Sequence, residues 1–169
     1  MAQFLDSAAA HHLLSAAQDY AAAAQTALAQ RLSACKMDQD QRAAHGYAWA
    51  ATSVAALGSL LGWAEMNAAQ AAPSRADQAV LTLGFAETLA QLVGGLPMGQ
   101  NEIFRPADLG IGQAARDLST AAATLLATDL APVRKQLAQD LADGLWPSET
   151  LHDGELDAIR DQYRRFTDD

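Results

Sequence analysis

Apolar residues recur at intervals of three and four along most of the chain, which is the spacing of one face of an α-helix. The first such face follows a cap at Asp6 or Ser7 and ends near Lys36. It is made of Leu13, Ala17, Tyr20, Ala24, Leu28, Leu32 and Cys35. Because the polar–apolar alternation of a half-buried strand does not recur, the pattern predicts helices rather than a sheet.

A second helix is predicted after a cap at Asp38, and its apolar pattern is wider than one face. One stripe contains Trp49, Ser53, Ala56, Leu60 and Trp63, and the stripe beside it contains Tyr47, Ala50, Val54, Leu57 and Leu61. At about 100° per residue the two stripes lie about 100° apart, so the helix is apolar over more than half its circumference. We therefore expect residues 43–64 to form the least exposed helix, in the middle of a bundle.

Capping residues mark the boundaries of three further helices. Ser74 and Asp77 have the spacing of a capping box after Pro73, and Gly94 and Gly95 suit a left-handed helix end. The face between them is Leu81, Phe85, Leu89 and Leu92, with Glu87 and Gln91 on the opposite side. The next face is Ile111, Ala115, Leu118, Ala122 and Leu125, and the last, after a start at Asp129 and Pro132, is Val133, Leu137 and Leu141 up to Gly144.

The final segment, DGELDAIRDQYRRFTDD, predicts a helix that Asp153 caps. Its apolar stripe is Leu156, Ile159, Tyr163 and Phe166. The sequence ends three residues after Phe166 with no Gly or Pro stop, so we expect a helix that is cut rather than finished. The predicted fold is all-α, a bundle of five or six helices over residues 1–152, followed over residues 153–169 by the start of another domain.

Composition and charge narrow the function. The 169 residues include 40 Ala, which is the best helix former and lets helix axes approach closely. The net charge of −9 would repel phosphate backbones, so we expect no nucleic-acid partner. Residues 43–64 carry no Asp, Glu, Lys or Arg, but Ala, Gly, Ser and Thr dominate them, so a buried helix is favoured over a membrane span.

The location we expect is the cytoplasm, because MAQFLDSAAAHH lacks the basic and apolar regions of a signal peptide. Cys35 cannot form an internal disulfide, since it is the single cysteine of the chain. We interpret it as a small core residue.

Residues with catalytic potential do not form a recognised pattern. Glu149 and His152 make one Glu-x-x-His, whereas a di-iron bundle needs two such pairs and two further Glu, so no metal is expected. His11 and His12 point about 100° apart on a helix and are interpreted as solvated or hydrogen-bonded histidines. His45 has no acidic residue one turn towards the C-terminus, which favours a role in helix packing. The phosphate-binding and nucleophile motifs of common small enzymes are absent, so this chain alone is not expected to be catalytic.

One loop stands out, because QLVGGLPMGQNEIFRP carries too many Gly and Pro residues for a helix interior. Glu102 and Arg105 follow Gly94 and Gly95 there, and together they could present an acid, a guanidinium and backbone amides to a ligand or partner. The alternative is that Arg105 pairs with Glu102 or a helix end and only fixes a crossover. The residues alone favour the alternative, and no catalytic residue is assigned.

Three stretches, AHGYAWAATSVAALGSLLGWAE, LGFAETLAQLVGGLPMGQNEIFRPADLG and AIRDQYRRF, resemble the N-terminal part of methylsuccinyl-CoA dehydrogenases, flavoproteins of the acyl-CoA dehydrogenase family. Residues 43–109 carry most of the resemblance. It implies a helical extension before the dehydrogenase proper, whose opening helix AIRDQYRRFTDD resembles. The family oxidises an acyl-CoA thioester with a Glu base and FAD, and neither the base nor the flavin fold is expected in this chain.

A second resemblance is internal to that family. Gln91, Gly94 and Gly95, followed by Glu102 and Arg105, are similar to a Gln-x-x-Gly-Gly loop in the helical domain of the dehydrogenases. Leu96-Pro97 and a Glu placed about one residue late depart from that pattern, so no catalytic role is transferred to Glu102.

The interpretation that follows is an N-terminal helical domain with a role in packing or assembly. Its expected partners are the remainder of its own dehydrogenase chain and further copies of it, and FAD belongs to the full-length enzyme. The alternative is a separate helical protein that binds a partner.

Overall fold

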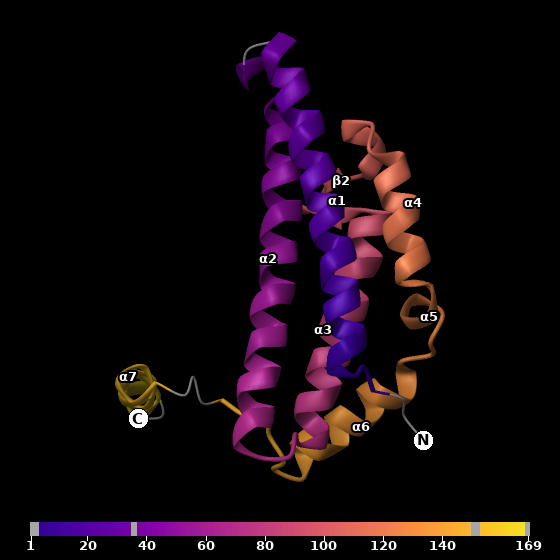
Figure 1. Cartoon of the computed structure of the whole chain (residues 1–169). Helices are drawn as coiled ribbons and strands as arrows, with labels where there is room; N and C mark the ends of the chain where they lie inside the picture. The colour runs from indigo at the N-terminus through magenta and orange to yellow at the C-terminus, as the bar shows by residue number, and fades with distance from the viewer. Residues whose placement is uncertain (1–3, 35–36, 150–152, 168–169) are drawn as a thin grey trace.

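Three long helices and a shorter one form the body of the molecule in the computed structural model, which describes residues 4–34, 37–149 and 153–167. They are α1 (Ser7–Ala34), α2 (Gln41–Gln70), α3 (Arg75–Gly94) and α4 (Gly112–Ala121). α1 packs against α2 and α4, and α3 packs against the same two helices, so the four surround one core (Figure 1). The predicted all-α bundle is confirmed.

Short-range hydrogen bonds explain where two of these helices, α1 and α3, begin. Asp6 Oδ1 accepts from the Ala9 amide at 2.7 Å, which caps α1 as predicted. Ser74 and Asp77 form the predicted capping box, in which each side chain accepts from the backbone N–H of the other residue, at 3.0 and 3.1 Å.

The predicted cap of the second helix is wrong. Asp38 lies in a 3₁₀ turn, η1 (Met37–Gln39), and Asp40 occupies the N-cap position of α2. Asp40 is also held from α1, because Arg31 Nε lies 2.8 Å from its carboxylate. This contact comes from a different helix, so the local pattern around Asp38 could not reveal it. Cys35 and Lys36 lie outside the described residues.

The helix at the centre of the molecule is α3 rather than α2, which corrects the prediction for residues 43–64. Only one stripe of α2 is buried over most of its length, the one that contains Val54, Leu57 and Leu61. On the other stripe Leu60 is half-buried and Trp49 is 41% exposed. α3 is contacted by α2, α4 and α6, so most of its circumference has a neighbour, whereas one side of α2 faces solvent.

The core is built largely from the faces that the periodicity predicts. Leu13, Ala17, Tyr20, Ala24 and Leu28 of α1 meet Leu81, Phe85, Leu89 and Leu92 of α3, together with Leu118 and Ala122. Tyr20 is fully enclosed, and this burial raises the pKa of its hydroxyl to about 12.

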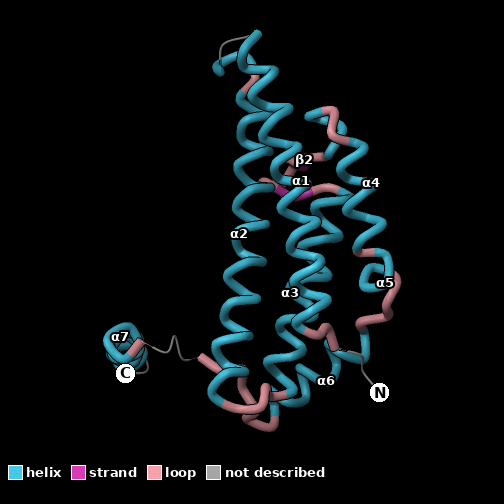
Figure 2. The backbone as a smooth tube through the Cα atoms, viewed as in Figure 1, coloured by secondary structure: helices cyan, strands magenta, loops and turns pink. Residues whose placement is uncertain are grey.

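The segment between α3 and α4 contains a small hairpin that the sequence did not predict. β1 (Leu96–Pro97) pairs antiparallel with β2 (Ile103–Phe104), in the register Leu96–Phe104 and Pro97–Ile103. A 3₁₀ turn, η2 (Pro106–Leu109), leads from it into α4 (Figure 2). We call residues 95–111 the crossover.

The C-terminal half of the bundle is a chain of shorter helices. The predicted fourth helix is divided at Ala122 into α4 and α5 (Ala123–Leu126). α6 (Ala131–Ala142) begins as predicted near Asp129, which accepts from the Ala131 amide at 3.0 Å. Arg75 Nε and Nη2 of α3 donate to the two carboxylate oxygens of Asp140, at 3.0 and 2.6 Å. This bidentate contact fastens α6 to the start of α3.

α7 (Gly154–Thr167) stands away from the bundle beyond the lower end of α2 (Figure 1). Asp153 caps it as predicted, because its carboxylate accepts from the amides of Glu155 and Leu156. None of its residues is buried, and the predicted apolar stripe is open: Leu156 49%, Ile159 47%, Tyr163 71% and Phe166 85% exposed.

None of the helices described combines the length and the apolar character needed to cross a bilayer.

Gly46→Ala should destabilise the bundle by about 1–3 kcal/mol, because a Cβ at this position would lie 2.2 Å from Phe104 Cδ2 and the Phe104 ring is fully buried. Gly62→Ala in the same helix is the matched control, since nothing lies within 4 Å of its Cβ position. Removing that mid-helix glycine should stabilise by about 0.5–1 kcal/mol. Urea unfolding of the three proteins measures both changes, and equal stability of the two variants would contradict the expected packing.

Candidate functional site

The two glycines of the predicted site, Gly94 and Gly95, end α3 and let the backbone turn into the crossover. Gly94 is the last residue of α3, and Gly95 has φ +147°, a conformation that side chains disfavour. A Cβ on Gly95 would also lie 2.8 Å from Ile103 Cγ2. Its amide donates to Gln91 O at 2.8 Å, so this N–H closes the helix and does not point to a ligand.

The crossover is seated on the N-terminal half of α2 by one aromatic side chain. Phe104 of β2 is fully buried, and its ring lies against Gly46, where any larger residue would collide with it. The Met98 amide donates to Glu102 O at 2.8 Å and closes the hairpin. Glu102 and Arg105 therefore flank an anchored strand.

Glu102 finds its partners on α2. Its carboxylate oxygens lie 3.9 Å from Arg42 Nη1 and 3.9 Å from His45 Nδ1, and its side chain remains about two-fifths exposed. Among the described residues no ion pair joins Glu102 to Arg105, and Arg105 instead lies at the start of a 3₁₀ helix, η2. The partners of the Glu102 carboxylate thus belong to α2, which lies far from Glu102 in the sequence.

Arg42 ties three parts of the crossover together. Its Nη2 donates to Ile103 O at 2.8 Å and to Asp108 Oδ2 at 3.3 Å, while Nη1 faces Glu102. Arg31 of α1 adds a hydrogen bond to Asp108 O. Two helices thus hold the crossover through arginines that sequence analysis did not select, because nothing near them in sequence marks their partners.

Asp108 is the acceptor at the centre of this contact. The Arg105 amide donates to its Oδ2 at 2.8 Å and lowers the pKa of the carboxyl below its ordinary value, and Arg42 acts in the same direction. Arg105 therefore acts on Asp108 through its backbone N–H and through its charge. The hydrogen bond from its N–H to Asp108 marks the start of η2, where Arg105 is the N-cap residue.

His45 is not packed between helices, contrary to the role in helix packing that the sequence favoured. It is exposed on α2, and Trp49 Nε1 donates to His45 Nε2 at 2.8 Å. This bond requires an unprotonated Nε2, which leaves Nδ1 to carry the proton on the side of Glu102. Acid, imidazole and indole thus form a row on the open stripe of α2.

The other polar candidates have ordinary partners. His11 contacts Glu65 at 2.7 Å, and hydrogen bonds from Ser7 and then His11 lower the pKa of Glu65. His12 is exposed, and Glu149 pairs with Arg164 of α7. His152 lies outside the described residues. No cluster of three or more His, Cys, Asp or Glu suited to a metal occurs in the described parts of the chain.

Two partly open pockets flank Leu5, towards the other end of the bundle from the crossover. One, of about 290 Å³, is lined by Phe4, Ala9, His12, Leu13, Thr124 and Leu125 among others. The other, of about 310 Å³, is lined by Leu61, Glu65, Pro73, Asp77 and Leu81 among others. Catalytic groups normally face a concave pocket, whereas Glu102 lies on an open surface.

Comparison with known proteins gives an independent view of the chain. No family model matches it. Over 148 residues it is 34% identical to the (2S)-methylsuccinyl-CoA dehydrogenase of Cereibacter sphaeroides, a match that covers 82% of this chain and 26% of that protein. The chain is related to an acyl-CoA dehydrogenase. It spans about a quarter of the length of that dehydrogenase relative, so most of the relative has no counterpart here.

Arg42→Met should loosen the crossover of this dehydrogenase-related chain. Losing the hydrogen bonds to Ile103 and Asp108 should cost about 1 kcal/mol, which corresponds to about fivefold faster amide exchange at Met98 and Gly110. Arg116→Met is the control, because Arg116 donates only to Gln113 of its own helix among the contacts described. Amide exchange is followed by mass spectrometry. Equal exchange rates in the two variants would contradict a role of Arg42 in holding the crossover.

Asp108→Asn should change the pH dependence of unfolding. Because the folded-state pKa of Asp108 is lowered, its carboxylate stabilises the fold above the ordinary value of 3.8 and loses this effect as the pH falls through the folded-state pKa. The stability gap between parent and variant should therefore be largest near pH 7 and shrink below pH 3.8. Asp19→Asn, at an exposed position of α1, should show a smaller gap at pH 7. Urea midpoints from pH 2 to 7 measure both.

Proposed function

We propose that the chain is the N-terminal helical domain of an FAD-dependent acyl-CoA dehydrogenase with a methylsuccinyl-CoA-like substrate. Its role would be packing and assembly, with the chemistry in the remainder of the protein. The relative acts on (2S)-methylsuccinyl-CoA by its name, and this chain matches a quarter of it. A cytoplasmic location and a homo-oligomeric full-length enzyme belong to the same proposal.

The open apolar stripe of α7 is the observation that carries this proposal. Its four large side chains are each about half or more exposed, on a helix with no buried residue. Burying side chains of this size is favourable by roughly 1.5–3 kcal/mol each, so a helix with this pattern gains much by docking. The following part of a dehydrogenase chain is the partner that the sequence similarity supports.

The crossover does not fit a flavin. Its Gly95 amide is engaged by Gln91, and the Glu102 carboxylate faces Arg42 and His45. A cofactor of this size needs a cleft that covers most of its surface, and this loop is anchored on an open helix face. We therefore derive no catalytic step from Gly94, Gly95, Glu102 or Arg105, and assign them to the path and seating of the chain.

A separate helical protein that captures a partner through α7 is the second candidate, and it uses the same open stripe. The two are distinguished by the gene. A reading frame that continues past Asp169 into a flavin-binding domain supports the first, and a stop codon there supports the second.

The proposal is tested by comparing residues 1–169 with the protein encoded by the continued reading frame. The long protein should be yellow, carry stoichiometric FAD and reduce a dye when acyl-CoA is added. Residues 1–169 should be colourless, and added FAD should keep its free fluorescence, because too little of the cofactor would be covered to offset the entropy lost on binding.

Glu102→Gln in the long protein separates structure from chemistry. Dye reduction should be retained, since Glu102 is assigned no step. A yellow 1–169 chain, or activity abolished by Glu102→Gln with the flavin still bound, would overturn the assignment and make the crossover an active site.

A further inference from the structure

Ser148, which lies between α6 and α7, is fastened to the bundle by three hydrogen bonds. Its amide donates to Asp77 Oδ1 at 2.7 Å, its hydroxyl donates to Asn67 Oδ1 at 3.2 Å, and its carbonyl accepts from Trp63 Nε1 at 3.1 Å. Asp77 and Asn67 are both buried. The Asp77 carboxylate also caps α3, so Ser148 is attached to a group that the fold itself holds still.

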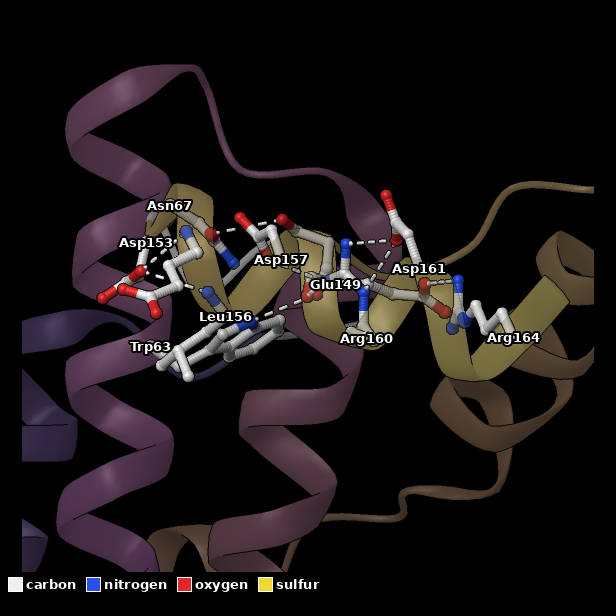
Figure 3. A network of polar contacts seen from close by, with 11 residues as sticks. Trp63, Asn67, Glu149, Asp153, Leu156, Asp157, Arg160, Asp161 and Arg164 are labelled. Atoms are coloured by element: carbon white, nitrogen blue, oxygen red, sulfur yellow. Dashed lines mark hydrogen bonds and ion pairs between the residues drawn. The ribbon is translucent and has the colours of Figure 1, made fainter. Parts of the chain in front are cut away.

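Glu149, the next residue, is fastened to α7 (Figure 3). Its carboxylate pairs with Arg164, and its carbonyl accepts from Arg160 Nη1. Arg160 is in turn held within its helix by Asp157 at 2.9 Å and Asp161 at 3.1 Å. Ser148 and Glu149 are thus neighbours in one extended segment. Ser148 bonds to the bundle and Glu149 bonds to α7.

Glu149 contacts the polar side of α7, through Arg160 and Arg164. At about 100° per residue, Arg160 and Arg164 lie within about 40° of each other, while the centre of the apolar stripe lies about 100° away. Leu156, Ile159, Tyr163 and Phe166 remain open for this reason. If α7 had instead contacted the bundle through its apolar stripe, these four side chains would be buried.

We propose that Ser148 and Glu149 are positioning residues of a two-sided joint, which sets the direction of α7 and keeps its apolar stripe turned away from the bundle. The bundle and α7 are then one oriented unit and not two bodies on a loose tether. The stripe is presented in one direction to whatever covers it. The joint is a property of this chain, so its test is separate from that of the proposed function.

The experiment measures the distance between α2 and α7 by double electron–electron resonance. Cys35→Ser removes the native thiol, and spin labels are placed on cysteines introduced by Ala55→Cys in α2 and Gln162→Cys in α7, both at exposed positions. The labelled chain should give a single narrow distance distribution. Glu149→Gln with Arg160→Gln removes both grips on α7 and should widen the distribution at least about twofold, as expected for a loose tether.

The matched control is Glu155→Gln with Arg165→Gln. It makes the same two charge changes on α7 itself, at exposed positions outside the joint, and should leave the distribution narrow. Circular dichroism checks that α7 stays helical in both variants. A broad distribution in the parent chain, or equal widths in the joint and control variants, would overturn the proposal.

Discussion

The fold depends on how the chain passes from α3 to α4, and one contact decides this passage. Phe104 inserts its ring where α2 has Gly46, so the hairpin lies close against a helix that a side chain would have held away. A buried aromatic ring contributes far more than the half-exposed ion pairs around it, which are worth about 1 kcal/mol or less each. Arg42 and Arg31 then fix the direction of a segment that Phe104 has already seated.

Features that depend on neighbours in sequence could be predicted without the structure. The caps at Asp6, Ser74 and Asp153, the helix start near Asp129 and the helix end at Gly94 follow from local hydrogen bonds and backbone conformation, and the structure confirms them. The periodic apolar faces likewise predict the core. Such features carry their physical cause within about one turn of helix.

Features that depend on which helices contact each other could not be predicted from the spacing of apolar and polar residues. The two stripes of α2 look alike in sequence, and only the placement of α1 and α3 shows that one of them stays open. The sequence suggested Glu102 or a helix end as the partner of Arg105, whereas Arg42 and His45 reach Glu102 through the fold. The loop between α3 and α4 could therefore be recognised from its Gly and Pro residues, but the contacts that hold it come from residues distant in sequence.

The contact between Arg75 and Asp140 bears on how the chain is made. The two residues are 65 positions apart, so α3 emerges from the ribosome long before the carboxylate that holds its first residue. At a synthesis rate of about 5–20 residues per second, the first three helices have several seconds in which to associate without α6. On this timing α1, α2 and α3 can associate before Asp140 is made, so the contact between Arg75 and Asp140 forms late in synthesis.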